Sequence, residues 1–583
     1  MKFQRTAVKQ AALVTSLQML LALIATYPLI GSIGTTVIGG GDSAQNVWNL
    51  WWVRQAASQG NVFPFFTNMI YYPAGVSLAY HPLGVLNGWA GIILQNVLGI
   101  SLISTYNVLL IGTFVLTGLA TFYLVNSLVE NSPIAFVASI IFTYAPIRVS
   151  RVVFGNLEMF STEFVPLAAL CVIKLFQTHQ RRYAVLAALA IAATTWLSLY
   201  LAIGTALLIA MLAGLLLIEK KSLVIPRLKL MSLTAFMTLM LVAPVIVPMI
   251  QNFQAFRDQS DQLTAASLNS ADLLGFFIPD NETAPLIKQI SPEIANFISK
   301  IYAAFLGNAY EKTVFIGYSV LALILFTGVF ARSRAFKIWL IMGSVFFILC
   351  LGPQLHVAGK SVGIHLPYEW LNQVPLIGFG RVPSRLAIFL MLALAVASGL
   401  GLKSLQDRYN RPTWVIGIIG VVVFMEFLVI PMNLDMRFTE IPAYYLQSRG
   451  PNEVQTAVLD IPIDLIGAQG PAGDYMLYQT VHQRPIVSGY ISRTPRYVLE
   501  LFQRPFMNEL RARIYNDKAP YHFDQQVLSR AKQELSELNI GTVILHRDKL
   551  SSKDFVTLYT ALVDVLAEPD YADDQVTVWE VNR

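Results

Sequence analysis

The sequence predicts a polytopic α-helical membrane protein of about eleven spans that ends in an extracytoplasmic α/β domain. Of its 583 residues, 55% are hydrophobic and 13% are charged, which is about half the charged fraction of a soluble protein. Twenty of the 35 acidic residues follow Leu434, so the apolar runs and the acidic residues occupy different parts of the chain. We therefore expect a transmembrane domain at 1–433 and a soluble domain at 434–583.

The first apolar run covers residues 11–30 and is long enough to cross a bilayer. It follows Lys2, Arg5 and Lys9, which favour a cytoplasmic N-terminus. A signal peptide has a shorter apolar core, so we expect this run to be a retained span.

Ten further apolar runs complete the predicted membrane domain. They are 103–128, 134–147, 161–177, 184–199, 201–218, 230–250, 313–330, 338–352, 386–402 and 413–432. Lys and Arg concentrate in the loops that this scheme places in the cytoplasm, and the odd number of spans places the C-terminal domain outside the plasma membrane. Residues 83–100 are interpreted as a re-entrant or interfacial helix, because a span there would invert the orientation of everything that follows.

The first outer loop, residues 32–82, contains Asp42, the one acidic residue among the first 129. If the segment after it is a helix, its polar side chains share one face and its apolar side chains share another. The polar face carries Asp42, Gln45, Asn46 and Asn49, and the apolar face carries Ala44, Val47, Trp48 and Trp51. This pattern is typical of an amphipathic helix in the plane of the membrane interface.

Asp42 permits two interpretations that do not exclude each other. It follows three glycines and suits the N-cap of a helix, with Gln45 at the capping-box distance. Alternatively, it is a functional carboxylate surrounded by amide side chains.

Other ionisable residues lie close to the predicted outer ends of spans. The short outer loop 148–163 contains Arg148, Arg151, Glu158 and Glu163, and ionisable groups in apolar surroundings are candidate functional residues. The alternative is that the two arginines only extend to the interface. Further candidates at outer boundaries are Glu311, Arg381 and Arg385, whereas His356 and His365 are interpreted as ordinary loop residues. Cys171 and Cys350 lie in apolar runs, so we expect free buried thiols.

The C-terminal part is predicted to be a small α/β fold. We expect strands at 457–463, 541–546 and 576–581, a strand and turn at 485–490, and helices at 473–482, 531–538 and 555–566. The segment contains no Gly-rich phosphate loop and no Cys/His cluster with metal-ligand spacing. The basic residues are not interleaved with aromatic residues in a run, so we expect no nucleic-acid partner.

The layout resembles that of the GT-C glycosyltransferases, which are membrane enzymes that use polyprenyl-phosphate-linked sugars. The resemblance lies in an Asp soon after the first span (Asp42), interfacial helices after it, a short polar second outer loop and a soluble C-terminal domain. The segments 155–158 (Gly-Asn-Leu-Glu), 381–385 (Arg-Val-Pro-Ser-Arg) and 482–490 (His-Gln-Arg-Pro-Ile-Val-Ser-Gly-Tyr) also look like those of bacterial YfhO-like and mannosyltransferase-like membrane proteins. One departure is that Ser43, and not a second acid, follows Asp42.

The resemblance implies transfer of a sugar from a polyprenyl-phosphate donor to a glycan, lipid or protein acceptor on the extracytoplasmic face, amid membrane lipids. Asp42 is expected to be the base or to orient the acceptor hydroxyl, with Glu158 or Glu311 as a second acid or metal ligand. The expected donor-phosphate ligands are Arg148 and Arg151, helped by Arg381 or Arg385, because the planar guanidinium binds two phosphate oxygens. Asn46 and Asn156 are further candidate site residues. A divalent metal such as Mg²⁺ or Mn²⁺ is left open. The alternatives are a transporter or flippase for lipid-linked glycans and a non-catalytic assembly protein.

Overall fold

The computed structural model describes residues 2–218, 224–257, 262–280, 291–308, 311–373, 380–409, 412–447, 456–463, 470–515 and 523–581. The chain divides into two compact units. Unit 1 comprises Met1–Ile33, Thr105–Ala243 and Ser260–Leu434, and unit 2 comprises Gly34–Ser104, Pro244–Gln259 and Asp435–Arg583. The division at residue 433 stays a prediction. In the structure, the first outer loop belongs to the same unit as the C-terminal part.

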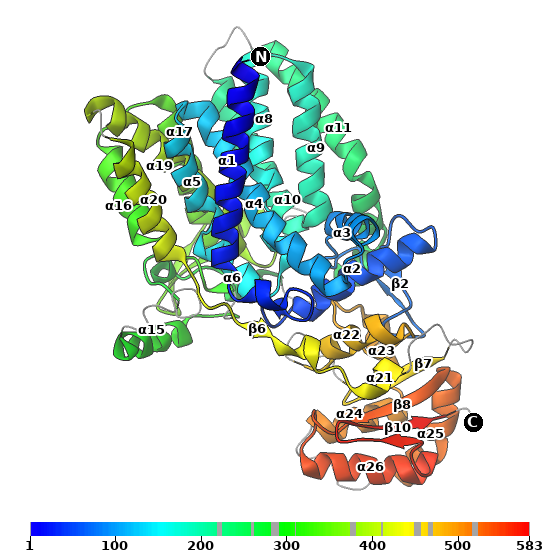
Figure 1. The fold of residues 1–583 in the computed structure, drawn as a ribbon. Helices are drawn as coiled ribbons and strands as arrows, with labels where there is room; N and C mark the ends of the chain where they lie inside the picture. The colour runs from blue at the N-terminus through cyan, green and yellow to red at the C-terminus, as the bar shows by residue number, and fades with distance from the viewer. Residues whose placement is uncertain are drawn as a thin grey trace. The chain divides into compact units, whose positions relative to one another are not determined.

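Unit 1 is helical, and each of the eleven predicted apolar runs contains or overlaps a helix (Figure 1). These helices are α1 (Lys2–Ala25), α4 (Leu102–Val129), α5 (Ser132–Thr143), α8 (Phe164–Thr178), α9 (Arg181–Leu197), α10 (Leu199–Leu217), α11 (Val224–Gln251), α16 (Tyr318–Gly328), α17 (Arg334–Cys350), α19 (Ala387–Tyr409) and α20 (Thr413–Phe427). Shorter elements between them are α6 (Pro146–Val153), α7 (Leu157–Phe160), α13 (Gln262–Leu268), η3 (Leu273–Phe276), α15 (Pro292–Ala304), β4 (Gln354–Val357), β5 (Lys360–His365), α18 (Tyr368–Leu371) and η5 (Pro383–Leu386).

Several of these helices are long enough to cross a membrane. Among the described residues, six helices qualify by length and composition, or seven if the bent pair α5 and α6 counts as one span. The remaining apolar helices are shorter; α16 has 11 residues and α20 has 15. The chain is therefore an integral membrane protein, and the number of eleven spans stays a prediction.

Helix α19 forms the centre of unit 1. Every residue from Ala387 to Leu402 is buried, and α19 packs against α5, α16 and α17. Close packing depends on two glycines: a Cβ on Gly399 would lie 2.7 Å from Val125 Cγ1, and one on Gly401 would lie 2.1 Å from Thr327 Oγ1. Small residues of this kind let helix backbones approach where no water drives their association. Cys171 and Cys350 are buried free thiols, as predicted.

The prediction that residues 148–163 form an outer loop is wrong, because most of the segment is helical and buried. Pro146 lacks an N–H and starts α6 at a bend of 47° from α5. Helix α6 and the single turn α7 carry Arg148, Arg151 and Glu158 into the interior. Both arginines are fully buried, so the alternative that they only extend to the interface is also wrong.

Unit 2 combines the first outer loop with an α/β arrangement. Its N-terminal elements are β1 (Val37–Ile38), α2 (Ser43–Ser58), β2 (Phe66–Thr67), β3 (Val76–Ser77) and α3 (Val85–Leu98), and α12 (Phe253–Arg257) also belongs to it. Its later helices are η6 (Met436–Thr439), α21 (Ala443–Gln447), α22 (Ala472–His482), α23 (Arg496–Leu501), α24 (Pro505–Tyr515), α25 (Gln525–Glu537) and α26 (Ser552–Leu566). Residues 83–100 contain the short helix α3, as predicted.

A four-stranded sheet of order β7-β8-β10-β9 lies in unit 2. Its strands are β7 (Ala457–Ile461), β8 (Ile540–His546), β9 (Tyr571–Ala572) and β10 (Val576–Glu580). Strands β7 and β8 are parallel and β10 is antiparallel to β8, while α26 lies along the sheet (Figure 1). The predicted strands at 457–463, 541–546 and 576–581 and the three predicted helices are present within a few residues. A separate extracytoplasmic domain stays a prediction.

In the predicted strand and turn at 485–490, the first half forms a backbone ladder, although the segment is not a regular strand. On one side, Val487 N–H donates to Val458 O in β7 at 3.0 Å, and Val458 N–H donates to Pro485 O at 2.9 Å. On the other side, Ile486 N–H donates to Met69 O at 2.8 Å and Tyr72 N–H donates to Ile486 O at 3.1 Å. The segment 485–487 therefore joins the first outer loop to the sheet of unit 2.

Candidate active site

Three charged residues of unit 1 form a buried ion-pair cluster, which we call the arginine–glutamate cluster: Arg151, Glu311 and Arg385. Glu311 Oε2 lies 3.1 Å from Arg151 Nη1, and Glu311 Oε1 lies 2.6 Å from Arg385 Nη2 and 3.1 Å from Arg385 Nε. Burial alone would raise the pKa of the Glu311 carboxyl, but the two guanidiniums outweigh it and hold that pKa well below its usual range. The structure thus brings together residues that are far apart in the sequence.

The other predicted residues of unit 1 lie in different surroundings. Glu158 in α7 is buried and close enough to Arg151 and Arg385 to interact with their charges. Arg148 donates to Phe160 O at 3.0 Å, to Thr117 Oγ1 at 3.2 Å and to Thr143 O. Because these acceptors hold its guanidinium, Arg148 fits a structural role better than phosphate binding. Asn156 is buried at the start of α7, and Arg381 is half-buried just before η5.

A cavity of about 320 Å³ lies next to the cluster, inside unit 1. Aliphatic and aromatic side chains of α10, α18, η5 and α19 form most of its wall, and Arg385 is the arginine that lines it. The Arg385 guanidinium lies 4.4 Å from the ring centre of Tyr200, which also lines the cavity. An apolar cavity with one cation in its wall suits a ligand that has an apolar chain and an anionic group.

Asp42 belongs to unit 2, where it precedes α2. It occupies the N-cap position, but its side chain makes no capping hydrogen bond. Instead, Asp42 Oδ1 accepts a hydrogen bond of 2.8 Å from the Tyr490 hydroxyl. Gln45 Nε2 donates to Tyr490 O at 2.9 Å and does not close a capping box. The side-chain capping interpretation is therefore wrong, because Tyr490 supplies a competing partner for both side chains.

Helix α2 is buried on both faces. Trp48 Nε1–H donates to Gln479 Oε1 in α22 at 2.7 Å, and Trp52 Nε1–H donates to Pro64 O at 3.0 Å. The aromatic face therefore packs inside unit 2, and the position of α2 in the plane of the membrane interface stays a prediction. On the polar face, Asn46 Nδ2 donates to Asp42 O at 3.2 Å, whereas Asn49 donates to Pro82 O at 3.0 Å.

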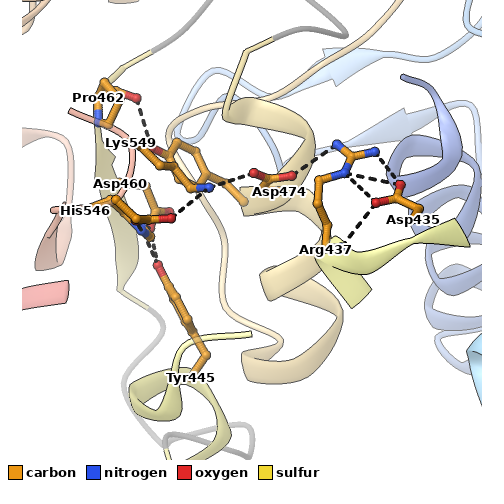
Figure 2. A network of polar contacts seen from close by, with 10 residues as sticks. Asp435, Arg437, Tyr445, Asp460, Pro462, Asp474, His546 and Lys549 are labelled. Atoms are coloured by element: carbon orange, nitrogen blue, oxygen red, sulfur yellow. Dashed lines mark hydrogen bonds and ion pairs between the residues drawn. The ribbon is translucent and has the colours of Figure 1, made fainter. Parts of the chain in front are cut away.

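A chain of polar contacts fixes the first turn of α2 to the rest of unit 2. Ser43 Oγ donates to Asp435 Oδ2 at 2.5 Å. Figure 2 shows how Arg437 then bridges Asp435 and Asp474, at 2.6 and 3.1 Å, and how Lys549 binds the other oxygen of Asp474 at 2.7 Å. Burial lowers the pKa of Lys549, but Asp474 outweighs burial and raises it. Lys549 therefore stays charged and forms the last ion pair in this series of polar contacts.

A second polar group in Figure 2 joins residues of β7, β8 and α21. His546 Nε2 lies 3.0 Å from Asp460 Oδ1 and 3.1 Å from the Tyr445 hydroxyl, which also donates to Asp460. His482 stacks on Tyr445 at 5.4 Å between ring centres. Its Nδ1 accepts from Arg484 N–H at 3.1 Å, so the proton of the neutral ring is on Nε2. Burial lowers the pKa of His482 to about 4, although Asp460 opposes this.

Acidification is therefore expected to weaken unit 2. The pKa of His482 is about 4 in the folded chain and ~6.5 in the unfolded chain. The neutral ring therefore contributes fully to the free energy of unfolding above pH ~6.5, and this contribution is lost as the pH falls towards 4. At pH 5 the free energy of unfolding is lower by about 2 kcal/mol. Hydrogen exchange of the α22 amides in the full chain measures it. His482→Asn keeps an acceptor but cannot take up the proton, so its pH dependence should be flatter; equal pH dependences would contradict the assignment.

A divalent metal such as Mg²⁺ needs several oxygen ligands that converge on one point. In the described ranges, no group of three or more His, Cys, Asp or Glu side chains is arranged to hold a metal ion. Asp435, which binds Ser43 beside Asp42, is already paired with Arg437. The described residues therefore do not fit a Mg²⁺ or Mn²⁺ site.

Comparisons with known proteins place this geometry in a known fold. The chain matches no protein-family model and no curated protein in sequence. Among solved structures, it is similar to the arabinofuranosyltransferase AftD from Mycobacteria, with a TM-score of 0.53, 13% identity, 99% of this chain covered and 40% of AftD covered. The chain thus spans less than half the length of AftD.

Two further structures are more distant. The Archaeoglobus fulgidus oligosaccharyltransferase matches with a TM-score of 0.49, 14% identity and coverage of 96% of this chain and 71% of that one. ArnT from Cupriavidus metallidurans matches with a TM-score of 0.44, 12% identity and coverage of 99% and 98%. Of the three, AftD is close enough to show a shared fold. The chain therefore shares the fold of AftD, which is the GT-C fold that its sequence predicts.

Proposed function

We propose that the protein is a glycosyltransferase that moves a sugar from a polyprenyl-phosphate donor to an acceptor hydroxyl on the extracytoplasmic face of the membrane. The observation that carries the proposal is the apolar cavity of unit 1 with Arg385 in its wall. A polyprenyl phosphate combines an apolar chain with an anionic group, and Arg385 is the cation that this cavity presents. The GT-C fold of the chain supports the same reaction class.

Each proposed group has one chemical task. Asp42 accepts the proton of the acceptor hydroxyl as its oxygen bonds to the anomeric carbon of the sugar. The bond from that carbon to the phosphate oxygen breaks, and the polyprenyl phosphate leaves with an additional negative charge. Arg385, with Arg151 behind it in the arginine–glutamate cluster, stabilises this charge electrostatically. Glu158 and Glu311 are proposed to hold these arginines, and Glu311 contacts both of them.

The test is incubation of the purified full chain in lipid nanodiscs with a panel of radiolabelled polyprenyl-phosphate sugars. We expect label to move to an acceptor, or to water as slow hydrolysis, for at least one donor, with none in a heat-treated sample. If the chain binds such lipids but releases no sugar from any donor, the enzyme assignment is wrong. Movement of the intact lipid across a vesicle bilayer would then support the transporter alternative.

A further inference from the structure

We infer that Tyr490 is a positioning residue that orients Asp42 and keeps its carboxylate charged. This gives a role to the segment His482–Tyr490, which the sequence singles out and the proposed reaction does not otherwise use. The inference rests on the proposed function of Asp42 as the base.

Tyr490 contacts the start of α2 at two points. Its hydroxyl donates to Asp42 Oδ1 at 2.8 Å, and its backbone carbonyl accepts from Gln45 Nε2 at 2.9 Å. Ser43, which lies between Asp42 and Gln45 in the sequence, is buried, whereas Asp42 and Tyr490 are only half-buried. The carboxylate is thus held in one orientation but remains accessible from outside the unit.

The segment before Tyr490 is fixed by its own contacts. Gly489 O accepts from the Tyr71 hydroxyl at 2.6 Å, and a Cβ on Gly489 would lie 2.9 Å from the Tyr71 ring. Glycine is therefore required at this close approach. The backbone ladder of 485–487 with β7 and the first outer loop holds the segment on both sides. The backbone that carries the Tyr490 phenol is therefore held in place, as a positioning residue requires.

The chemical consequence follows from the direction of the hydrogen bond. A phenol O–H that donates to a carboxylate stabilises its charged form. Asp42 then remains deprotonated, and able to accept a proton, down to a lower pH than it would without Tyr490. Removal of the hydroxyl should move its titration to higher pH by about one unit.

The experiment compares wild type with Tyr490→Phe, which keeps the ring and removes only the hydroxyl. A water-soluble carbodiimide with an amine nucleophile labels protonated carboxyls, and mass spectrometry reads the extent of labelling at Asp42 between pH 4 and 8. We expect the midpoint of this labelling to move upward by about one pH unit in the variant. We also expect the acid limb of kcat/KM to move in the same direction, with kcat reduced about tenfold and donor KM unchanged.

Tyr571→Phe is the matched control, because Tyr571 also donates to a carboxylate of unit 2, that of Asp573, at 2.8 Å. It should leave the Asp42 midpoint unchanged. The labelling readout needs no turnover, so it separates this inference from the proposed function. If the Asp42 midpoint is the same in wild type and Tyr490→Phe, the inference is overturned even if the enzyme is active. A shifted midpoint in a chain that transfers no sugar would support the contact and refute the proposed function.

Discussion

Replacement of Asp42 by Asn is expected to reduce sugar transfer by about 10²–10⁴-fold, the usual cost of losing a general base. The amide is almost the same size as the carboxylate and can still accept from the Tyr490 hydroxyl, so α2 should keep its position. Since Asp42 makes no side-chain cap, loss of a cap does not complicate the result. The measurement is single-turnover transfer from a saturating labelled donor, with hydrogen exchange of α2 as the check on folding.

Asp573→Asn is the matched control for Asp42→Asn. Asp573 is also a carboxylate of unit 2 that accepts from a tyrosine hydroxyl, but the proposed reaction gives it no role. Its replacement should leave transfer unchanged. A well-folded Asp42→Asn protein that transfers sugar at the wild-type rate would refute the base assignment.

Replacement of Arg385 by Ala is expected to weaken binding of the donor by about 100-fold, since it removes a charge-assisted contact to phosphate worth about 3 kcal/mol. Arg385 is preferred to Arg151 for this test because it lines the cavity, whereas Arg151 is fully buried against Glu311. Arg385→Lys keeps the charge but loses the planar fork, so its affinity should lie between those of wild type and Arg385→Ala. Calorimetry with a short-chain polyprenyl phosphate measures each affinity.

Arg408→Ala provides the comparison for Arg385→Ala. Arg408 lies near the end of α19, with its guanidinium 5.2 Å from the ring centre of Phe330, but it is exposed and does not line the cavity. Its loss should leave phosphate binding intact. Equal affinities of wild type, Arg385→Ala and Arg385→Lys for the polyprenyl phosphate would rule out Arg385 as the phosphate ligand.

Most of the helices could be predicted from the sequence because a membrane helix satisfies its own backbone and needs only an apolar run. The segment 148–163 could not be predicted in this way. Its arginines are charged, and charge suggests an exposed loop. Arg148 is nevertheless buried, because oxygens of Thr143, Thr117 and Phe160 accept hydrogen bonds from its guanidinium. Those acceptors become neighbours only in the folded chain.

The sequence indicates candidate residues but not the contacts that they make. Asp42, Glu311 and Arg385 each have a local signal, namely an ionisable residue near the predicted outer end of an apolar run. Tyr490 is separated from Asp42 by 448 residues, and neither residue's surroundings in the sequence indicate the other. Tyr200 and Tyr368, which line the cavity, lie in segments with no distinguishing pattern. Long-range pairing is set by tertiary packing, which a single sequence does not reveal.

The backbone ladder between residues 69–72, 485–487 and β7 has a consequence for biosynthesis. Residues 69–72 are separated from 485–487 by more than 400 residues. Closing so long a loop costs conformational entropy before the contacts form, so these long-range contacts are expected to form late. A ribosome therefore completes nearly all of the apolar helices before Asp42 can acquire its final neighbours. The apolar helices are expected to insert into the membrane first, and the first outer loop is expected to fold last. Until the C-terminal part is synthesised, that loop lacks its final partners, so its folding is expected to depend on chaperones or on rapid synthesis of the C-terminal part.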